Sequence, residues 1–142
     1  MRKMEFLGKA KDVMNKNVQI LSPDEDAKSA AEKMIRLNIG SLVVMDGRKL
    51  VGIVTKSDYV RAFLGNTTRN LKIADIMSKP VITCDPETSI LDIIHTMRFN
   101  SIRHIPVVKG SKLMGIVTDF DLACSATSSV SKILMMLRPP KG

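Results

Sequence analysis

The chain contains an ungapped internal repeat, which constrains its fold more than any other feature. Residues 12–59 match residues 75–122 in residue type at a constant offset of 63 positions. The segment 49–55, for example, has the sequence KLVGIVT and returns at 112–118 as KLMGIVT. An ungapped repeat of this kind is one supersecondary unit that is copied and packed against itself. We therefore expect two similar units, and we look for function where the copies differ.

Length and composition favour a protein with an aliphatic core that works inside the cell. The 142 residues fit one compact pair of half-domains, 44% of them are hydrophobic, and tryptophan is absent. No apolar run reaches the roughly 18 residues of a membrane span. Segment 1–8 lacks the apolar core of a signal peptide, and Cys84 and Cys124 lie outside any CxxC motif. We expect a cytoplasmic protein, with no membrane segment, whose cysteines are reduced and buried.

The net charge of +8 leaves three interpretations open. The basic residues, which gather in segments 2–16 and 48–72, are typical of solvated surface, of a site for an anionic small ligand, or of a nucleic-acid interface. Aromatic residues make up only 4% of the chain, and no stacking set or helix-turn-helix pattern is present. These absences weigh against nucleic acid, whereas a phosphate-bearing small molecule needs only a few of the charges.

Each copy predicts the element order β-α-β-β-α, which is an α+β fold. Apolar residues at i, i+3, i+4 and i+7 predict the long helices, and an Asp-Gly pair between apolar runs predicts a hairpin. The first copy is expected to contain a helical turn ending at Met14, strand 18–21, helix 25–37, strands 42–45 and 50–54, and a helix after Thr55. The second is expected to contain a turn ending at Met77, strand 81–84, helix 88–99, strands 105–108 and 113–117, and a helix after Thr118.

The repeat also predicts the domain boundaries. We expect a first repeat with a basic N-terminal arm at 1–65, a linker at 66–73, a second repeat at 74–128, and a C-terminal helix and tail at 129–142. The apolar run at 133–137 surrounds much of one helix and needs a covering surface. A second copy of the chain is one candidate for that surface.

The repeated GIVTxxD pattern at 52–58 and 115–121, with IPVV at 105–108, strongly resembles the CBS domain, named after cystathionine β-synthase. The resemblance extends from residue 11 to about residue 127. It implies a tandem CBS-domain pair, or Bateman module, with pseudo-twofold symmetry, whose two sheets meet to form two clefts. It also implies dimers of such modules, and adenosyl ligands (AMP, ADP, ATP or S-adenosylmethionine) in the clefts.

The threonine and aspartate of each pattern, Thr55 with Asp58 and Thr118 with Asp121, have two interpretations. A threonine at the N-cap with an acid three residues later is nearly a capping box, which satisfies free N–H groups of the helix. Alternatively, the helix start faces a ligand phosphate. In the family pattern the aspartate holds the ribose and the threonine lies on the sugar or phosphate. The resemblance favours ligand contact at one of the two pairs at least.

The copies differ just before the hairpin, where Gly40-Ser41 in the first corresponds to Arg103-His104 in the second. The resemblance implies that side chains at these positions point into the clefts and that basic ones reach phosphates. An arginine can make a forked contact with phosphate oxygens, and a histidine adds a donor. The alternative is that both side chains cap the strand edge in solvent. We expect two unequal sites, with Arg103 compatible with either aspartate.

Other positions make weaker contributions to the predicted sites. Lys56 and Ser57 favour an anion near the first copy, whereas Asp119 opposes one near the second. Ile20 and Thr83, on the first strands, are expected to make backbone contacts with an adenine.

The sequence offers no pattern for catalysis or for a metal ion. His95 has no second histidine or cysteine at metal spacing, and no nucleophile with a base, Walker motif or Rossmann glycine pattern is present. Because the repeats occupy nearly the whole chain, we expect no attached catalytic domain and no required cofactor. The predicted function is a stand-alone, non-enzymatic regulator. It would bind AMP, ADP or ATP, with S-adenosylmethionine as a further candidate, form a homodimer and act on a separate effector protein. The alternatives are a nucleic-acid-associated regulator that uses the basic arm, and a structural dimerisation module with empty clefts.

Overall fold

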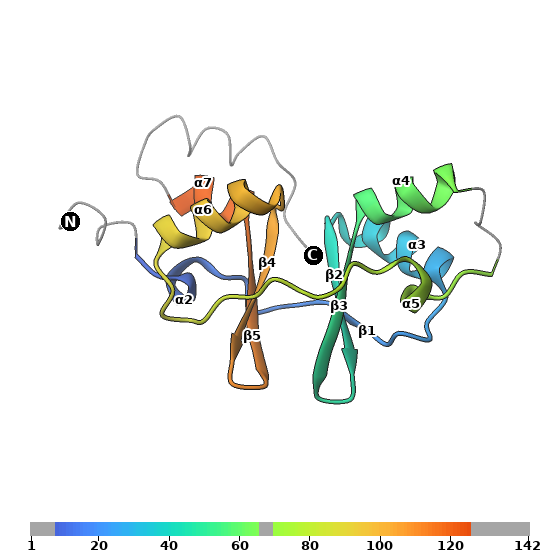
Figure 1. Cartoon of the computed structure of the whole chain (residues 1–142), viewed down its shortest axis with the longest axis horizontal. Helices are drawn as coiled ribbons and strands as arrows, with labels where there is room; N and C mark the ends of the chain where they lie inside the picture. Colours follow the sequence, from blue (N-terminus) through green and yellow to red (C-terminus); the bar gives the residue numbers. More distant parts are fainter. Residues whose placement is uncertain (1–7, 66–69, 126–142) are drawn as a thin grey trace. The chain divides into compact units, whose positions relative to one another are not determined.

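The computed structural model describes residues 8–65 and 70–125, which belong to two compact units (Figure 1). Of the described residues, the first-hairpin unit contains those between 19 and 81, and the second-hairpin unit combines 8–18 with 82–125. Both mix short strands with helices, so the predicted α+β class with two repeats is confirmed. Three parts of the prediction lie outside the described residues. They are the basic arm at residues 2 and 3, the linker residues 66–69 and the expected apolar helix at 130–137.

The first-hairpin unit is built on a three-stranded sheet in the order β1-β2-β3. Strand β1 (Ile20–Leu21) runs parallel to β2 (Ser41–Asp46), and β2 pairs antiparallel with β3 (Lys49–Thr55). The expected Asp-Gly turn joins β2 to β3, and its Gly47 has a φ of +62°, a conformation that glycine adopts without strain. The predicted strands are therefore present and slightly longer at the hairpin than the sequence indicated.

Three helices cover this sheet: α3 (Ala27–Leu37), α4 (Lys56–Leu64) and α5 (Ile73–Ile76). The carboxylate of Asp26 caps α3 by accepting a hydrogen bond from the Ser29 N–H at 2.9 Å. The helix ends at Asn38, whose φ of 52° gives the left-handed conformation typical of helix C-termini. The aliphatic core that these elements enclose consists of Leu21, Ala27, Ala30, Met34, Leu42, Val44, Val54 and Ile73.

The second-hairpin unit has the antiparallel pair β4 (His104–Lys109) and β5 (Lys112–Thr118) with helices α2 (Ala10–Val13), α6 (Ile90–Asn100) and α7 (Asp119–Ser125). Its core consists of Ala10, Ile93, Met97, Ile105, Val107 and Val117.

The strand predicted at 81–84 is reduced to a single parallel bridge between Cys84 and Val107. In the first-hairpin unit, the Val43 N–H donates to the Gln19 carbonyl at 3.1 Å and so extends the pairing of β1. Position 106, which corresponds to Val43 in the repeat, is a proline and has no N–H to donate. The missing donor explains why the prediction of a full strand was wrong here.

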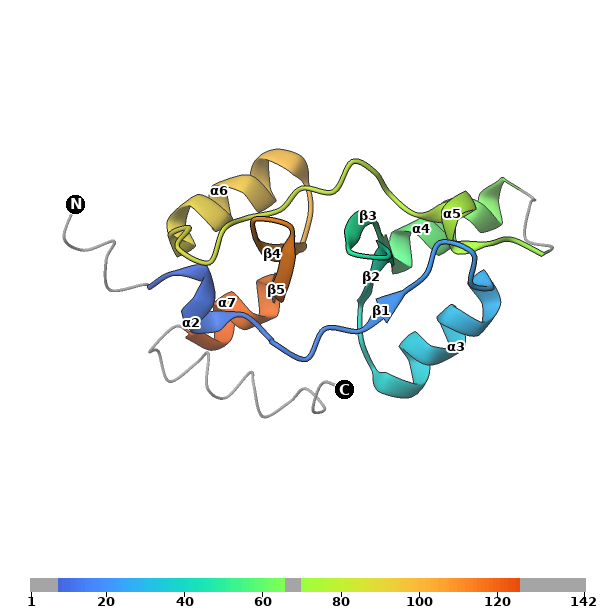
Figure 2. The same cartoon turned by 90° about the horizontal axis from the view of Figure 1, so that it is seen from below.

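The short helix that opens each sequence repeat packs on the hairpin of the other repeat. Helix α2 belongs to the second-hairpin unit (Figures 1 and 2). In that unit the Asn15 and Ile116 backbones exchange hydrogen bonds of 2.8 and 3.0 Å. Helix α5 belongs to the first-hairpin unit, where Ser78 and Ile53 exchange bonds of 2.9 and 3.1 Å. A sequence repeat and a compact unit are therefore different stretches of the chain.

The methionine that ends each short helix lies against a glycine of the adjacent hairpin. A Cβ atom added to Gly52 would lie 2.5 Å from the Met77 sulfur. One added to Gly115 would lie 2.8 Å from the Met14 sulfur and 2.9 Å from the Asn15 carbonyl oxygen. The glycine of each GIVT pattern is thus required for the close approach of the exchanged helix.

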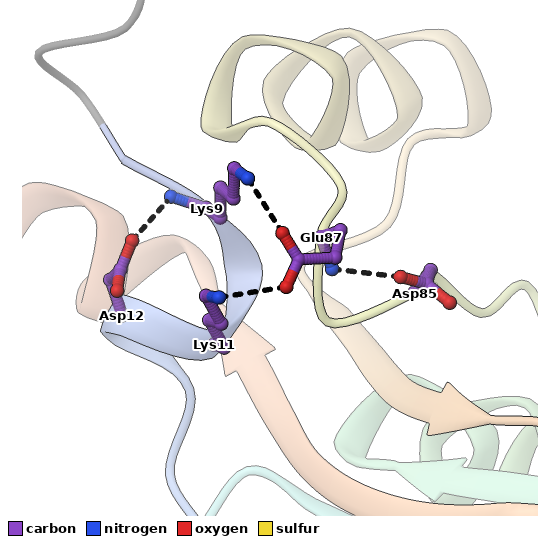
Figure 3. Close-up of polar contacts among 5 residues, drawn as sticks. All are labelled: Lys9, Lys11, Asp12, Asp85 and Glu87. Carbon is purple, nitrogen blue, oxygen red and sulfur yellow. Dashed lines mark hydrogen bonds and ion pairs between the residues drawn. The ribbon is translucent and has the colours of Figure 1, made fainter.

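Helix α2 is further attached through Glu87, in the turn before α6 (Figure 3). The Lys9 and Lys11 ammonium groups contact its two carboxylate oxygens at 2.6 and 2.7 Å. Hydrogen bonds from Lys11 and then Lys9 lower the pKa of Glu87 to about 2, and the same contact raises the pKa of Lys11. The three side chains are about half-exposed, so solvent screens much of this attraction.

Candidate functional site

The junction of β5 with α7 contains the predicted pair Thr118 and Asp121. The Thr118 N–H and hydroxyl both donate to the Asp121 carboxylate at 2.9 Å, and the Asp121 N–H donates back to the Thr118 hydroxyl at 3.1 Å. This reciprocal arrangement is a capping box, so the structural interpretation of the TxxD spacing is confirmed. Thr118 is buried, whereas Asp121 is half-buried.

The equivalent junction of β3 with α4 is also a capping box. Asp58 accepts from the Thr55 N–H at 2.7 Å and from the Thr55 hydroxyl at 3.3 Å. It also accepts from the Arg61 guanidinium and from the Ser78 hydroxyl, both at 2.6 Å. Only 3% of Asp58 is exposed. The two junctions therefore share the capping-box geometry, and Asp58 contacts Arg61 and Ser78 in addition.

The sequence-based analysis did not identify Arg61 or Ser78. The i+3 spacing of Arg61 from Asp58 on one helix was a usable indication, because residues three apart share a helix face. Ser78 lies 20 residues from Asp58 and reaches it only because α5 packs on this unit. No local pattern could have predicted that contact.

The residues before each hairpin lie next to the threonine of their own unit. Ser41 is in register with Thr55, and His104 is in register with Thr118. The Asp119 N–H donates to the Arg103 carbonyl oxygen at 3.1 Å, which fixes the start of β4 against the start of α7. Each unit thus brings its predicted threonine and aspartate and the residues before the hairpin to one end of that hairpin.

Exposure differs among the remaining predicted residues. Lys56 and Ser57 are exposed on the first turn of α4, Arg103 is exposed, and Gly40 is half-buried. Ile20 lies on β1 opposite Val43 and is 48% exposed, and Thr83 is exposed beside the bridge at Cys84. None of these predicted residues belongs to the buried core of its unit.

A groove of about 510 Å³ adjoins the second junction. Its lining combines apolar and charged side chains from α6, the segment before β4, and α7. The lining residues are Ile94, Met97, Arg98, Ser101, Ile102, Arg103, Asp119 and Leu122. In the first-hairpin unit the position of Leu122 is taken by Tyr59, whose hydroxyl donates to the Ala27 carbonyl at 2.7 Å. Arg103, which is predicted to contact an anion, is one of the residues that line this groove.

The described residues give no support for metal or thiol chemistry. Residues 8–65 and 70–125 contain no group of three histidine, cysteine or acidic side chains that could hold a metal ion. His95 is an exposed residue of α6. Burial, with a smaller effect of Asp85, raises the pKa of Cys84 to about 11, so that its thiol is protonated at neutral pH. None of the helices in the same ranges is long and apolar enough to cross a membrane.

Comparison with known families identifies the repeat. The model of the CBS domain matches residues 10–65 and again residues 73–137. The chain belongs to the CBS-domain family. Its two CBS domains lie in tandem, as the resemblance of the repeated pattern predicted. CBS-domain pairs are generally regulatory rather than catalytic modules.

Individual relatives are similar in sequence to this CBS pair. The uncharacterized protein YlbB of Bacillus subtilis is 37% identical over 120 residues, which cover 82% of this chain and 81% of YlbB. Other relatives are longer, and the chain spans 52% of one and 40% of another.

Two solved structures extend the comparison. The CBS domain NE2398 is 30% identical with a TM-score of 0.79, and the match covers 84% of this chain and 98% of that one. The CBS domain pair of protein MJ0100, solved in complex with 5′-methylthioadenosine and S-adenosyl-L-methionine, is 27% identical with a TM-score of 0.75. That match covers 92% of this chain and 98% of MJ0100's.

Proposed function

We propose that this CBS pair is a non-catalytic regulatory module that binds an adenosyl nucleotide at the junction of β5 and α7. The observation that carries the proposal is the gathering of Arg103, His104, Thr118 and Asp121 at one end of the second hairpin. The adenosyl ligands of MJ0100, a structural neighbour at a TM-score of 0.75, support the same ligand class.

The chemistry of these side chains suits a nucleoside with a small charged group. Asp121 supplies a carboxylate, the type of acceptor that pairs with the two hydroxyls of a ribose. Arg103 is exposed and can make a forked contact with one phosphate. Asp119 lies at the same junction and repels additional negative charge. AMP or S-adenosylmethionine therefore suits this junction better than ATP.

Regulation would follow from differential binding. A ligand that binds one conformation of the pair more tightly than another shifts the population toward it, and a separate effector protein would respond to that change. The homodimer, the effector and a cytoplasmic location belong to the same proposal.

A thermal-shift screen with AMP, ADP, ATP, S-adenosylmethionine, NAD and GTP tests the function. Binding to the native state raises its stability by about 2.7 kcal/mol at a ligand concentration of 100 Kd, which gives a clear rise in Tm. Asp121→Ala should lose the rise, and Asp92→Ala, at an exposed position of α6, should keep it.

Two results would contradict the proposal. A Tm that no adenosyl compound changes at millimolar concentration would favour a structural module without a ligand. Salt-dependent binding of DNA or RNA without any nucleotide response would favour the nucleic-acid alternative.

A further inference from the structure

The apolar side chains of the groove beside α6 and α7 are anchored in the core of the second-hairpin unit. Met97 belongs to that core, and Ile102 and Leu122 are half-buried and pack against it. Ile94 adds an apolar side chain that is 40% exposed. Because core packing holds these side chains in place, a partner can bind them without first ordering the surface.

The charged residues of the groove are two arginines and one aspartate, and all three are exposed. Arg98 lies in the last turn of α6, Arg103 precedes β4, and Asp119 begins α7. None of the ion pairs within residues 8–65 and 70–125 involves either arginine of the groove. Positive charge therefore exceeds negative charge in the groove, which attracts an acidic partner and repels a basic one.

The two guanidinium groups are specific to the second-hairpin unit. In the repeat, Arg98 corresponds to Ile35 and Arg103 corresponds to Gly40, so neither has a counterpart. Guanidinium groups bind carboxylates through paired hydrogen bonds and are weakly hydrated, which makes arginine a common anchor at protein interfaces. The combination of two such groups with apolar side chains is therefore a further difference between the copies.

The exposure of the groove favours a protein segment over a small molecule. Small-molecule sites bury most of the ligand surface, whereas every charged residue here is exposed. A second copy of this chain is disfavoured, because the chain carries a charge of +8 and would meet the two arginines with further positive charge. An amphipathic helix with acidic flanks fits better, since it offers apolar anchors at i, i+3, i+4 and i+7 together with carboxylates.

We propose that the groove of α6 and α7 is the docking surface for an acidic amphipathic helix of the effector protein, with Arg98 as its charged anchor. The inference rests on the proposed function for the existence of an effector. It adds where that effector binds and which chemistry it presents. Arg98 is not among the residues of the proposed nucleotide site, so the two proposals can fail separately.

Fluorescence anisotropy of the full chain with a labelled synthetic peptide tests the surface in the absence of nucleotide. The probe is a helix-forming peptide of about 16 residues with leucines at i, i+3, i+4 and i+7 and glutamates beside them. We expect saturable binding that weakens in about 1 M salt, and shifts of the backbone amide NMR signals of the groove residues. A peptide with lysine in place of each glutamate should bind about ten-fold more weakly or less.

Charge variants locate the bound peptide on the molecule. Arg98→Glu should weaken binding of the glutamate peptide by about ten-fold or more, and Asp119→Asn should strengthen it by about two-fold. Arg36→Glu is the matched control, because Arg36 is an exposed arginine in the last turn of α3, in the other unit. It changes the net charge by the same amount as Arg98→Glu and should stay within about two-fold of the unmodified chain.

Apolar variants test the other half of the surface. Ile94→Ala should weaken binding by about three-fold or more, because it removes apolar area from the contact. Phe99→Ala is the control, since Phe99 lies on the same helix, is 89% exposed and is not among the lining residues. It should change the affinity by less than about two-fold. Thermal melts check that each variant remains folded.

Several results would overturn the inference. No binding at millimolar peptide, equal binding of the lysine peptide, or an equal loss in Arg36→Glu would remove the groove as the acidic docking surface. An equal loss in Phe99→Ala would indicate unspecific apolar contact.

Two further results would assign the groove to another occupant. A dimer that Arg98→Glu dissociates, measured by sedimentation velocity, would assign it to a second copy. A clear gain of peptide affinity in Leu134→Ser would assign it to the C-terminal apolar run, which lies outside the described residues. Either result overturns the inference and leaves the proposed function to its own test, the thermal-shift response to adenosyl compounds.

Discussion

Tyr59 is the single tyrosine of a chain that lacks tryptophan, so its ionisation can be followed by absorbance alone. Its hydroxyl donates to the Ala27 carbonyl at 2.7 Å and joins α4 to the start of α3. Burial, followed by the charges of Asp26 and Asp58, raises the pKa of Tyr59 from 10.0 to about 12. A half-buried neutral phenol that joins two helices is therefore a direct reporter of the first-hairpin unit.

Titration of the phenolate band should give a midpoint of about 12 in the folded chain and 10.0 in the unfolded chain. The folded chain binds the Tyr59 proton more tightly than the unfolded chain does. The contribution of Tyr59 to the free energy of unfolding is therefore fully present below pH 10 and is lost as the pH rises toward 12. Tyr59→Phe should remove this pH dependence. It should also lower the free energy of unfolding at neutral pH by about 1 kcal/mol, because the hydrogen bond is lost. A folded-state midpoint near 10 would contradict the packing of Tyr59.

At the scale of elements, the attachment of α2 through Glu87 predicts a dependence on acid and salt. The folded-state pKa of Glu87, about 2, lies below the value of 4.5 expected without its lysine partners. Its stabilising contribution is therefore present above pH 4.5 and is lost as the pH falls toward 2.

Glu87→Gln should lower the free energy of unfolding at pH 7, and the difference from the unmodified chain should close between pH 4.5 and about 2. The difference should also shrink in about 1 M salt, since the side chains are half-exposed. Urea unfolding across this pH range measures it, with Glu32→Gln on the exposed face of α3 as the control for losing one charge. A gap that persists at pH 2 would contradict the ion-pair explanation.

The elements themselves could be predicted from the sequence to within a few residues. The helix expected at 25–37 is observed at Ala27–Leu37, because its apolar spacing and the Asp26 cap are local features. The strand expected at 81–84 failed because its pairing depends on Pro106, more than 20 residues away. Local patterns specify an element, whereas pairing between elements depends on partners that are remote in the chain.

The candidate site, like the fold, could be predicted from the sequence only where its contacts are local. The TxxD spacing predicted the capping boxes at both junctions, and the repeat predicted that the junctions differ before each hairpin. The sequence did not indicate that Ser78 reaches Asp58, because that contact requires α5 to pack on the first-hairpin unit. The ligand roles of these residues stay predictions.

At the scale of the whole molecule, the exchange of the short helices means that cutting the chain between its repeats does not separate its units. The fragment 1–65 retains α2, which packs in the second-hairpin unit, and lacks α5. Ile73 of α5 is 0% exposed and belongs to the core of the first-hairpin unit. The fragment 19–81, of nearly equal length, keeps α5 and every other element of that unit.

We expect 19–81 to be more stable than 1–65 by about 2–5 kcal/mol, the usual cost of losing one large buried aliphatic side chain. A unit of this size is only marginally stable, so that loss should abolish cooperative thermal unfolding in 1–65. Circular dichroism melts of the two fragments make the comparison. Ile73→Ala in 19–81 is the matched control, because it removes the same side chain without changing the chain length. If 1–65 melts as cooperatively as 19–81, the first repeat is self-sufficient and the helix exchange does not determine the folding unit.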